Sequence, residues 1–448
     1  MGSNWSALPL ENIATVIDSK HQTPQYSESG YPMVRVVDVK GGELSLIGAK
    51  KVTADVYADY SKGRDPEVGD LIISRVGRHR KISYVSSKDK FCLGQNVAFI
   101  IPRDNDRFLY YALISPPLMR EIDSMAVGAA QKTISLKNIK GLKIPQPPLN
   151  ERAKISHFLS SLDDKVALNH QINMTLEQMA LALFKSWFVD FDPVVDNALD
   201  TNFFEQGLEY PSELLRRAET RRAVRARQDF KPLPDATRQL FPSAFEKCTE
   251  PCLGLGGWVP QGWAISNFGA EFDVIIGQSP PSTTYNKNKN GMPFFQGKMD
   301  FGFRFPSERV YCTKPKRIAK KNDTLVSMRA PVGHINLANE NCAIGRGLAA
   351  ARHKSGSISF SYYTISSLSE KLKLFEAAGT VFGCITQKDL HSLHLIKPDS
   401  NVINRFELLC SSWDKHIEHI SIETLALTNL RDTLLPKLIS GELRFGYI

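Results

Sequence analysis

The 448-residue sequence lacks any uninterrupted apolar run that approaches the ~18–20 residues of a membrane-spanning helix. Its first residues, MGSNWSALPL, do not show the basic stretch and apolar segment of a secretory signal. The seven cysteines are dispersed, and the CxxxC spacing of Cys248 and Cys252 has neither a second pair nor a nearby histidine. This pattern argues against a disulfide framework and against a zinc site. We therefore expect a cytoplasmic protein with free thiols, no bound metal and no membrane partner.

Signatures of catalysis are also missing. The sequence has no HExxH, no GxSxG and no glycine-rich dinucleotide fingerprint. The stretch GMPFFQGKM at 291–299 has one residue too many between its glycines for a phosphate loop, and a methionine replaces the Ser or Thr that would bind Mg²⁺. We expect neither catalysis nor a bound cofactor in this chain. A nuclease or methyltransferase with unrecognised motifs is the alternative.

Basic charge is abundant but unevenly distributed. The net charge is +9, with 20 basic and 15 acidic residues in 1–150 and 18 basic and 10 acidic residues in 255–400, while the other segments are slightly acidic. A basic excess confined to two blocks favours a polyanionic partner, double-stranded DNA first. A coiled-coil adaptor whose basic blocks bind acidic proteins is a further alternative.

The two basic blocks resemble each other at a shift of about 250 residues, which indicates an internal repeat. Both contain short strands separated by Gly, Pro and Asn turns, the pattern of a mixed α+β domain. The matching stretches are GYPMVRVVD (30–38) and GMPFFQGKMD (291–300), GDLIISRVG (69–77) and NDTLVSMRAPVG (322–333), and VGAAQKTISLKNIKGLKIPQPP (127–148) and AGTVFGCITQKDLHSLHLIKPD (378–399).

Each block is followed by a long segment whose apolar residues alternate in steps of three and four, the pattern of a coiled-coil seam. We predict helices over 151–190 and 401–448 that pack antiparallel, which sets Lys165 opposite Glu423. The predicted seam residues are Ile155, Phe158, Leu162, Lys165, Asn169, Ile172, Leu176, Met179 and Leu183 in the first helix, and Phe406, Leu409, Trp413, His416, Ile420, Glu423, Leu427, Leu430 and Leu434 in the second.

These features predict an α+β fold with a pseudo-two-fold internal repeat. Two α/β domains, 1–150 and 258–400, are expected to be separated by the antiparallel, coiled-coil-like helix pair. Residues 191–257 are predicted to be a loop-like linker, whose Arg-rich stretch LLRRAETRRAVRARQ (214–228) forms a solvated helix face in preference to a DNA-binding arm.

Residues suited to DNA contact occur in clusters in both blocks. Arg, Lys, Gln and Asn discriminate base edges, and other basic and hydroxyl groups bind phosphate. The candidates are Arg35, Arg75, Arg78, Arg80, Lys81, Gln95, Asn96, Lys132 and Thr133 in the first block, and Gln278, Ser279, Gln296, Lys298, Arg304, Arg329, His334, Arg346, Gln387 and Lys388 in the second. The triplet QKT at 131–133 is matched with TQK at 386–388.

The whole chain resembles the specificity subunit of a type I restriction–modification system. The resemblance rests on PQPPLNERAKISHFLSSLDDKV at the first block–helix junction, FKSWFVDFDPV (184–194), the linker LFPSAFEKCTEP…GWVPQGW (240–263) and the closing LRDTLLPKLISGEL (430–443). The second junction, IKPDSNVINRF, departs from the pattern because it lacks the double proline.

The resemblance implies that each block is a target recognition domain that reads one half of a split DNA sequence. The helix pair would set the gap between the halves and dock two modification (methyltransferase) subunits, which recruit restriction (motor–nuclease) subunits. S-adenosylmethionine, ATP and Mg²⁺ would be used by those partners, not bound by this chain.

Overall fold

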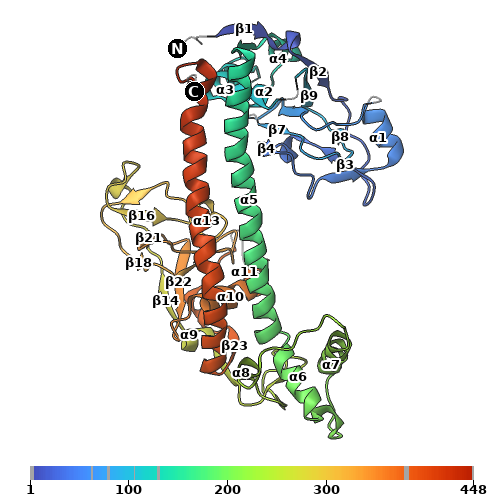
Figure 1. Cartoon of the computed structure of the whole chain (residues 1–448). Helices are drawn as coiled ribbons and strands as arrows, with labels where there is room; N and C mark the ends of the chain where they lie inside the picture. The colour runs from blue at the N-terminus through green and yellow to red at the C-terminus, as the bar shows by residue number, and fades with distance from the viewer. Residues whose placement is uncertain are drawn as a thin grey trace. The chain divides into compact units, whose positions relative to one another are not determined.

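The computed structural model describes residues 5–61, 64–77, 81–104, 106–128, 132–377 and 383–445 (Figure 1). The chain divides into two compact units, unit 1 (Met1–Gln171 with Ile420–Ile448) and unit 2 (Ile172–His419). Each unit contains an α/β domain and parts of both long helices. Across the described residues, no helix combines the length and the apolar composition that crossing a membrane requires.

Unit 1 contains three sheets, built from strands whose apolar residues are largely buried. A five-stranded sheet has the order β2-β9-β6-β7-β4, a three-stranded sheet the order β5-β3-β8 with β3 and β8 parallel, and β1 pairs with β10. The strands are β1 (Ser6–Pro9), β2 (Ala14–Asp18), β3 (Tyr31–Val34), β4 (Gly42–Glu43), β5 (Lys50–Val52), β6 (Leu71–Ser74), β7 (Ile82–Tyr84), β8 (Cys92–Leu93), β9 (Val97–Pro102) and β10 (Lys143–Gln146). The helices of the domain are α1 (Ala54–Ser61), α2 (Phe108–Ile114), α3 (Pro116–Ser124) and α4 (Leu136–Gly141).

Unit 2 repeats the core of this topology, with one strand fewer in the first sheet and two more in the second. Its sheets have the orders β14-β22-β19-β20, β15-β17-β16-β21-β18 and β13-β23, and β16 and β21 are parallel as β3 and β8 are. The strands are β13 (Ala264–Asn267), β14 (Phe272–Ile276), β15 (Tyr285–Asn286), β16 (Met292–Phe295), β17 (Tyr311–Cys312), β18 (Ile318–Ala319), β19 (Thr324–Ser327), β20 (Ile335–Leu337), β21 (Cys342–Ile344), β22 (Leu348–His353) and β23 (His394–Lys397). The helices of the domain are α9 (Phe268–Glu271), α10 (Ile358–Ser367), α11 (Ser369–Ala377) and α12 (Gln387–His391). The shared strand order confirms the internal repeat and the α+β class.

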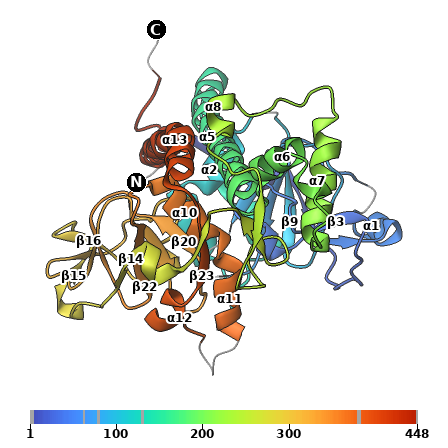
Figure 2. The same ribbon diagram turned by 90° about the horizontal axis from the view of Figure 1, so that it is seen from below.

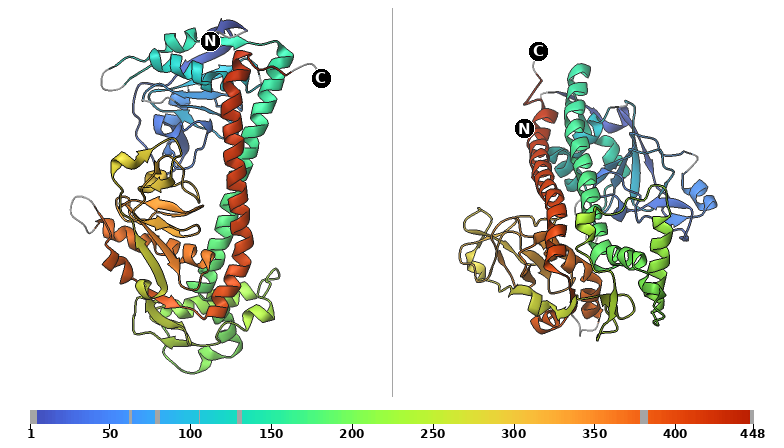
Figure 3. Two further views of the ribbon diagram at one scale, coloured as in Figure 1. Left: turned by 90° about the vertical axis from the view of Figure 1, so that its left-hand side faces the viewer. Right: turned by 60° about the horizontal axis from the view of Figure 1, so that its bottom comes forward.

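The two long helices are α5 (Leu149–Phe188) and α13 (Ser400–Ser440), each with segments in both units. Within each unit their segments lie side by side and run antiparallel (Figure 3). In unit 1, Lys165 Nζ lies 3.3 Å from Glu423 Oε2, which confirms the predicted pair. In unit 2, the rings of Phe184 and Phe406 lie 5.8 Å apart.

The predicted heptad seam holds at some positions and drifts at others. Met179 and Leu430 are each 44% exposed and His416 is exposed, whereas their neighbours Ala180 and Ile417 are fully buried. Between Ile155 and Phe184, 29 residues apart, the inward-facing positions of α5 recur at eight successive intervals. Their average spacing is about 3.6 residues, whereas a heptad seam has an average spacing of 3.5. A straight α-helix has this period, so a strict heptad pattern leaves the contact face after several turns.

The other predicted seam residues lie in or beside the contact face. Ile155, Leu162, Phe406 and Ile420 are buried. Phe158, Leu183, Leu409, Trp413 and Leu434 pack against the hydrophobic cores of their units, and Ile172, Leu176 and Leu427 are half-buried.

The prediction that residues 191–257 form a loop is wrong. They contain α6 (Asp192–Asp200), α7 (Ser212–Arg225), α8 (Asp235–Arg238) and β11 (Phe245–Lys247), which pairs with β12 (Trp258–Pro260). The segment packs into the unit 2 core because its aromatic residues, such as Phe191, Phe241 and Phe245, are buried there.

The Arg-rich stretch forms a helix with an exposed face that includes Arg216 and Arg222, as predicted, but its other face is paired. Helices α6 and α7 lie side by side (Figure 2), and Arg217, Arg221 and Arg225 of α7 pair with acids of α6. The partners are Asp192, Asp196 and Asp200, so both helices repeat their charges every four residues. A DNA-binding arm is not favoured here, since these three cations already have partners.

Candidate nucleic-acid interface

In unit 1, most described DNA-contact candidates lie where strands of two sheets end. Arg35 follows β3, Lys81 precedes β7, and Gln95 with Asn96 forms the turn between β8 and β9. The backbone N–H of Arg75 donates to Asn96 O at 2.8 Å, which ties this turn to the end of β6. The structure therefore brings these separate clusters of the sequence to one edge.

The segment that carries Lys132 and Thr133 reaches the same edge. Thr133 forms a β-bridge with Val76, and Ile134 N donates to Arg75 O at 3.0 Å. Lys81 and Lys132 are exposed, while Gln95, Asn96 and Thr133 are half-buried. Arg78 and Arg80 lie outside the described residues.

Arg35 is held in a defined orientation by a neighbouring carboxylate. Its Nε and Nη2 donate to the two oxygens of Asp38 at 2.9 and 3.1 Å, and these bonds raise the pKa of the guanidinium. Arg35 thus remains a candidate that is oriented in advance, although part of its hydrogen-bonding capacity is used by Asp38.

Arg75 does not fit the role predicted for it. Its side chain is buried, its Nη1 lies 2.5 Å from Asp18 Oδ1, and its Nε donates to Ile134 O at 3.2 Å. The guanidinium therefore joins the end of β2 to the 132–134 segment, a structural contact that leaves little surface for a base edge.

Unit 2 builds the same edge from the equivalent strand ends. Gln278 N donates to Ile344 O at 3.0 Å, and Arg346 N donates to Ser279 Oγ at 3.3 Å. Lys298 Nζ and His334 Nε2, which are 36 residues apart in sequence, lie at 3.0 Å. The structure thus gathers six of the ten unit 2 candidates, and five of these are exposed: Gln278, Ser279, Gln296, Lys298 and Arg346.

Arg329 is exposed beside this edge, and the pair Gln387–Lys388 is exposed elsewhere, on α12. Arg329 forms a β-bridge with Cys384, in the place of the Val76–Thr133 bridge of unit 1. The match of QKT with TQK is therefore shifted by two residues, because Thr386 caps α12 as Ser135 caps α4. Gln387 and Lys388 lie on α12 itself.

The prediction that Arg304 contacts DNA is wrong. Its side chain is 1% exposed and pairs with Glu177 and Asp414 of the long helices. No base edge or phosphate reaches a guanidinium enclosed in this way.

The sequence analysis missed Lys20 and His21. Ser19 N donates to Val97 O as Gly277 N donates to Leu348 O, so Lys20 and His21 occupy the places of Gln278 and Ser279. His21 is exposed and its Nε2 lies 3.0 Å from Asp18 Oδ2. The alignment of strands 14–18 and 272–276 within the repeat was the signal that could have identified them.

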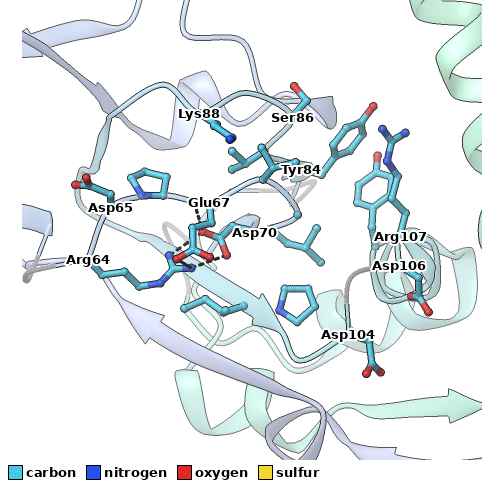
Figure 4. A pocket seen from close by; sticks show the side chains of 18 of the residues that line it. Arg64, Asp65, Glu67, Asp70, Tyr84, Ser86, Lys88, Asp104, Asp106 and Arg107 are labelled. Atoms are coloured by element: carbon cyan, nitrogen blue, oxygen red, sulfur yellow. Dashed lines mark hydrogen bonds and ion pairs between the residues drawn. The ribbon is translucent and has the colours of Figure 1, made fainter.

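A cavity of about 730 Å³ in unit 1 is electrically mixed and adds nothing to this edge (Figure 4). Arg64 donates to Asp70 at 2.7 and 2.9 Å, and Lys90 and Arg107 pair with Asp65 and Asp164. Five carboxylates and four cations line the cavity, so it does not favour a polyanion. Within the described part of the chain, no group of three or more His, Cys, Asp or Glu is placed to hold a metal ion.

Comparisons with known proteins agree on one family. Residues 3–178 match the family described as "Type I restriction modification DNA specificity domain". A protein of Methanocaldococcus jannaschii, by its name the type I restriction enzyme MjaX specificity subunit, is 26% identical over 98% of this chain and 94% of its own length. The HindI specificity subunit of Haemophilus influenzae is 25% identical over 84% of this chain and 86% of its own length.

The fold is similar to that of a solved S subunit. The type I restriction–modification S subunit from M. genitalium covers 97% of this chain and 96% of its own length, with a TM-score of 0.54 at 14% identity. This likeness concerns the fold alone.

Proposed function

We propose that the chain is a type I restriction–modification DNA specificity subunit, and that its two units read the two halves of a bipartite duplex DNA target. The observation that carries the proposal is the repeated edge. Equivalent strand ends in both units present exposed or half-buried Lys, Arg, Gln and Asn, the residues that contact base edges and phosphates.

In this proposal the antiparallel helices α5 and α13 act as a ruler that fixes the gap between the half-sites. Their surfaces dock two modification (methyltransferase) subunits, and restriction subunits join through these. Methyl transfer from S-adenosylmethionine and ATP- and Mg²⁺-dependent cleavage belong to those partners, and we assign no catalytic step to this chain. The complex acts on DNA in the cytoplasm.

Selection of bound duplexes from a random library tests the proposal. The intact chain, assembled with its modification subunits, is expected to recover a split motif, and its affinity should fall steeply as salt rises because phosphate contacts release counterions. Lys81→Ala should weaken one half of the motif and Lys298→Ala the other. Lys88→Ala, an exposed lysine in the unit 1 cavity, is the matched control and should leave both halves intact.

Two results would overturn the proposal. If Lys81→Ala and Lys298→Ala weakened both halves equally, the edges would not be separate readers. If the purified chain alone turned over DNA with Mg²⁺, ATP and S-adenosylmethionine, the enzyme alternative would replace it.

A further inference from the structure

A single buried arginine links the unit 2 domain to both long helices. Arg304, in the segment between β16 and β17, is 1% exposed. Its Nη1 lies 2.5 Å from Glu177 Oε2 of α5, and its Nη2 lies 2.6 Å from Asp414 Oδ1 of α13. One planar guanidinium therefore bridges two helices, as its fork of donors allows.

The domain encloses this ion cluster with aromatic and hydroxyl groups. The guanidinium lies 3.6 Å from the ring centroid of Tyr362 and donates to Tyr363 Oη at 3.1 Å. Ser359 Oγ donates to Asp414 Oδ2 at 2.6 Å. These groups come from α10, so the cluster joins α10, α5 and α13.

The backbone of Arg304 connects the cluster to the candidate interface. Leu337 N donates to Arg304 O at 2.8 Å, so Arg304 flanks β20. His334, which lies 3.0 Å from Lys298, directly precedes β20 in the hairpin from β19. A displacement of Arg304 would therefore move the strand that carries part of the unit 2 edge.

In unit 1, the positive charge at the equivalent contact between the domain and the long helices comes from a different element. Gly42 lies beside β7 at the place that corresponds to that of Arg304 beside β20. The N–H of Gly42 donates to Tyr110 Oη at 3.0 Å. The cation comes instead from α13, because Arg431 Nη1 lies 2.6 Å from Asp163 Oδ1. Tyr111 Oη donates to the other oxygen of Asp163 at 2.9 Å.

The difference can be followed through the repeat. At the shift of 251 residues, Asp163 corresponds to Asp414, but Arg431 corresponds to Ala180 and Thr428 corresponds to Glu177. The helix surface of unit 1 therefore supplies its own cation, Arg431, which pairs with both Asp163 and Asp432. The helix surface of unit 2 presents two carboxylates, Glu177 and Asp414, and takes its cation from the domain.

We propose that Arg304 is the positioning residue of the unit 2 interface, and that the helix pair carries two differently charged sockets, each of which accepts only its own domain. The unit 2 socket, Glu177 with Asp414, needs a domain with a cation at position 304. In the unit 1 socket, Asp163 and Asp432 are already paired with Arg431, so a second cation at the place of Arg304 would meet the like charge of Arg431. The structural part of this inference is independent of the proposed function, and only its DNA readout depends on that function.

Hydrogen exchange of the full chain tests the structural part. Arg304→Met leaves two half-buried carboxylates without a counter-charge, and should lower the protection of β20 and α10 amides at least about 100-fold while β7 and α2 are unchanged. The triple variant Arg304→Met, Glu177→Gln, Asp414→Asn should regain at least about 10-fold of that loss. Exposed Lys316→Met is the control and should change neither unit.

The charge of the unit 1 socket is tested with a graft. Gly42→Arg should reduce β7 protection more than Gly42→Ala does, and adding Arg431→Ala should remove the excess. Gly42 has φ +66°, which strains any side chain, so Gly42→Ala measures this cost by itself; an added Cβ meets no described atom within 4 Å. Unchanged protection in Arg304→Met, a triple variant as weak as the single one, or no rescue by Arg431→Ala would overturn the inference.

Duplex selection with Arg304→Lys then tests positioning. Lysine keeps the charge but lacks the fork, so the selected motif should keep its unit 1 half while its unit 2 half loses information or shifts by a base pair. A motif identical to that of the wild type would overturn the positioning role. If the wild-type chain selects no motif, the proposed function fails, whereas the exchange results still decide the socket inference.

Discussion

Comparison of the two units shows fixed carboxylates and exchangeable arginines. Asp70 and Asp323 occupy the same turn before β6 and β19, and each accepts the backbone N–H of the residue three positions earlier, at 2.8 and 2.7 Å. Asp70 is paired with Arg64 of the preceding loop, whereas Asp323 is paired with Arg352 of β22. The helix sockets follow the same rule, since Asp163 and Asp414 correspond while their arginines do not.

The physical reason lies in the reach of the side chains. A short carboxylate that closes a turn or caps backbone donors must stand at one place in the chain, because its partners are backbone groups. A long arginine needs only to bring its guanidinium within hydrogen-bonding distance, so strands, loops or helices can supply it. The repeat therefore preserves the acid pairs Asp70/Asp323 and Asp163/Asp414 while their arginines change position, whereas Glu177 has Thr428 in its place and is not preserved.

The strongest test of this rule compares acid and base substitutions. Asp70→Ala and Asp323→Ala should each destabilise their own unit by about 3 kcal/mol, because a buried turn loses its acceptor and an arginine its partner. Arg64→Ala and Arg352→Ala should cost only about 1 kcal/mol, since both side chains are partly exposed. Denaturant unfolding followed by unit-resolved hydrogen exchange measures both. Equal losses for acids and bases would contradict the rule.

A second difference concerns how each long helix ends. After α13, Gly441 has φ +74° and an added Cβ would lie 2.6 Å from the Trp5 ring. In unit 2, Trp263 packs instead against the rings of Phe188, the last residue of α5, and Phe191, which follows the helix. Gly441→Ala should therefore destabilise unit 1 by about 2 kcal/mol, through strain and overlap together.

Gly69→Ala is the matched control for this prediction. Its φ is +99°, but an added Cβ meets no described atom within 4 Å, so only the conformational cost of about 1 kcal/mol applies. Thermal unfolding of the two variants separates the terms. If they lost the same stability, the Trp5 contact would not matter.

A smaller difference should appear on acidification. Burial between Phe272 and Phe360 lowers the pKa of His353, more than Glu271 at 4.0 Å raises it. Lys354 and Lys397 also lower the pKa, and Ser355 Oγ lies 2.7 Å from Nδ1. The neutral ring is favoured in the folded state, so its contribution to stability is present above the unfolded pKa of about 6.5 and is lost as the pH falls below it.

Unit 1 has Pro102 in the place of His353, so the comparison predicts an asymmetric response. Exchange protection of β14 and β22 should fall between pH 7 and 5.5 relative to that of β2 and β9. His353→Gln should flatten this difference, since it cannot titrate. A pH response that persisted in His353→Gln would assign the effect to another group.

The sequence predicted the repeat, the long helices and the strand-end clusters because each depends on local pattern. It did not identify the buried arginines, because the partners of Arg304 lie 127 and 110 residues away and those of Arg75 lie 57 and 59 away. Only the assembled fold tells a buried guanidinium from an exposed one. The α6–α7 pairs were different, because the four-residue spacing of Asp192, Asp196 and Asp200 matches that of the arginines in the sequence itself.

The smallest effect concerns the pair that the seam pattern did predict. Lys165 and Glu423 are 44% and 37% exposed, so their coupling in a double-mutant cycle should be only about 0.5 kcal/mol and should shrink at 1 M salt. Asn169, one turn along α5 from Lys165, is buried, and its Nδ2 donates to Glu423 Oε2 at 2.7 Å and to Thr424 Oγ1 at 3.2 Å. Reversal of both charges should therefore restore the ion pair but not the Asn169 bond. Full recovery of stability in the reversed pair would show that Asn169 contributes nothing, and zero coupling would refute the register.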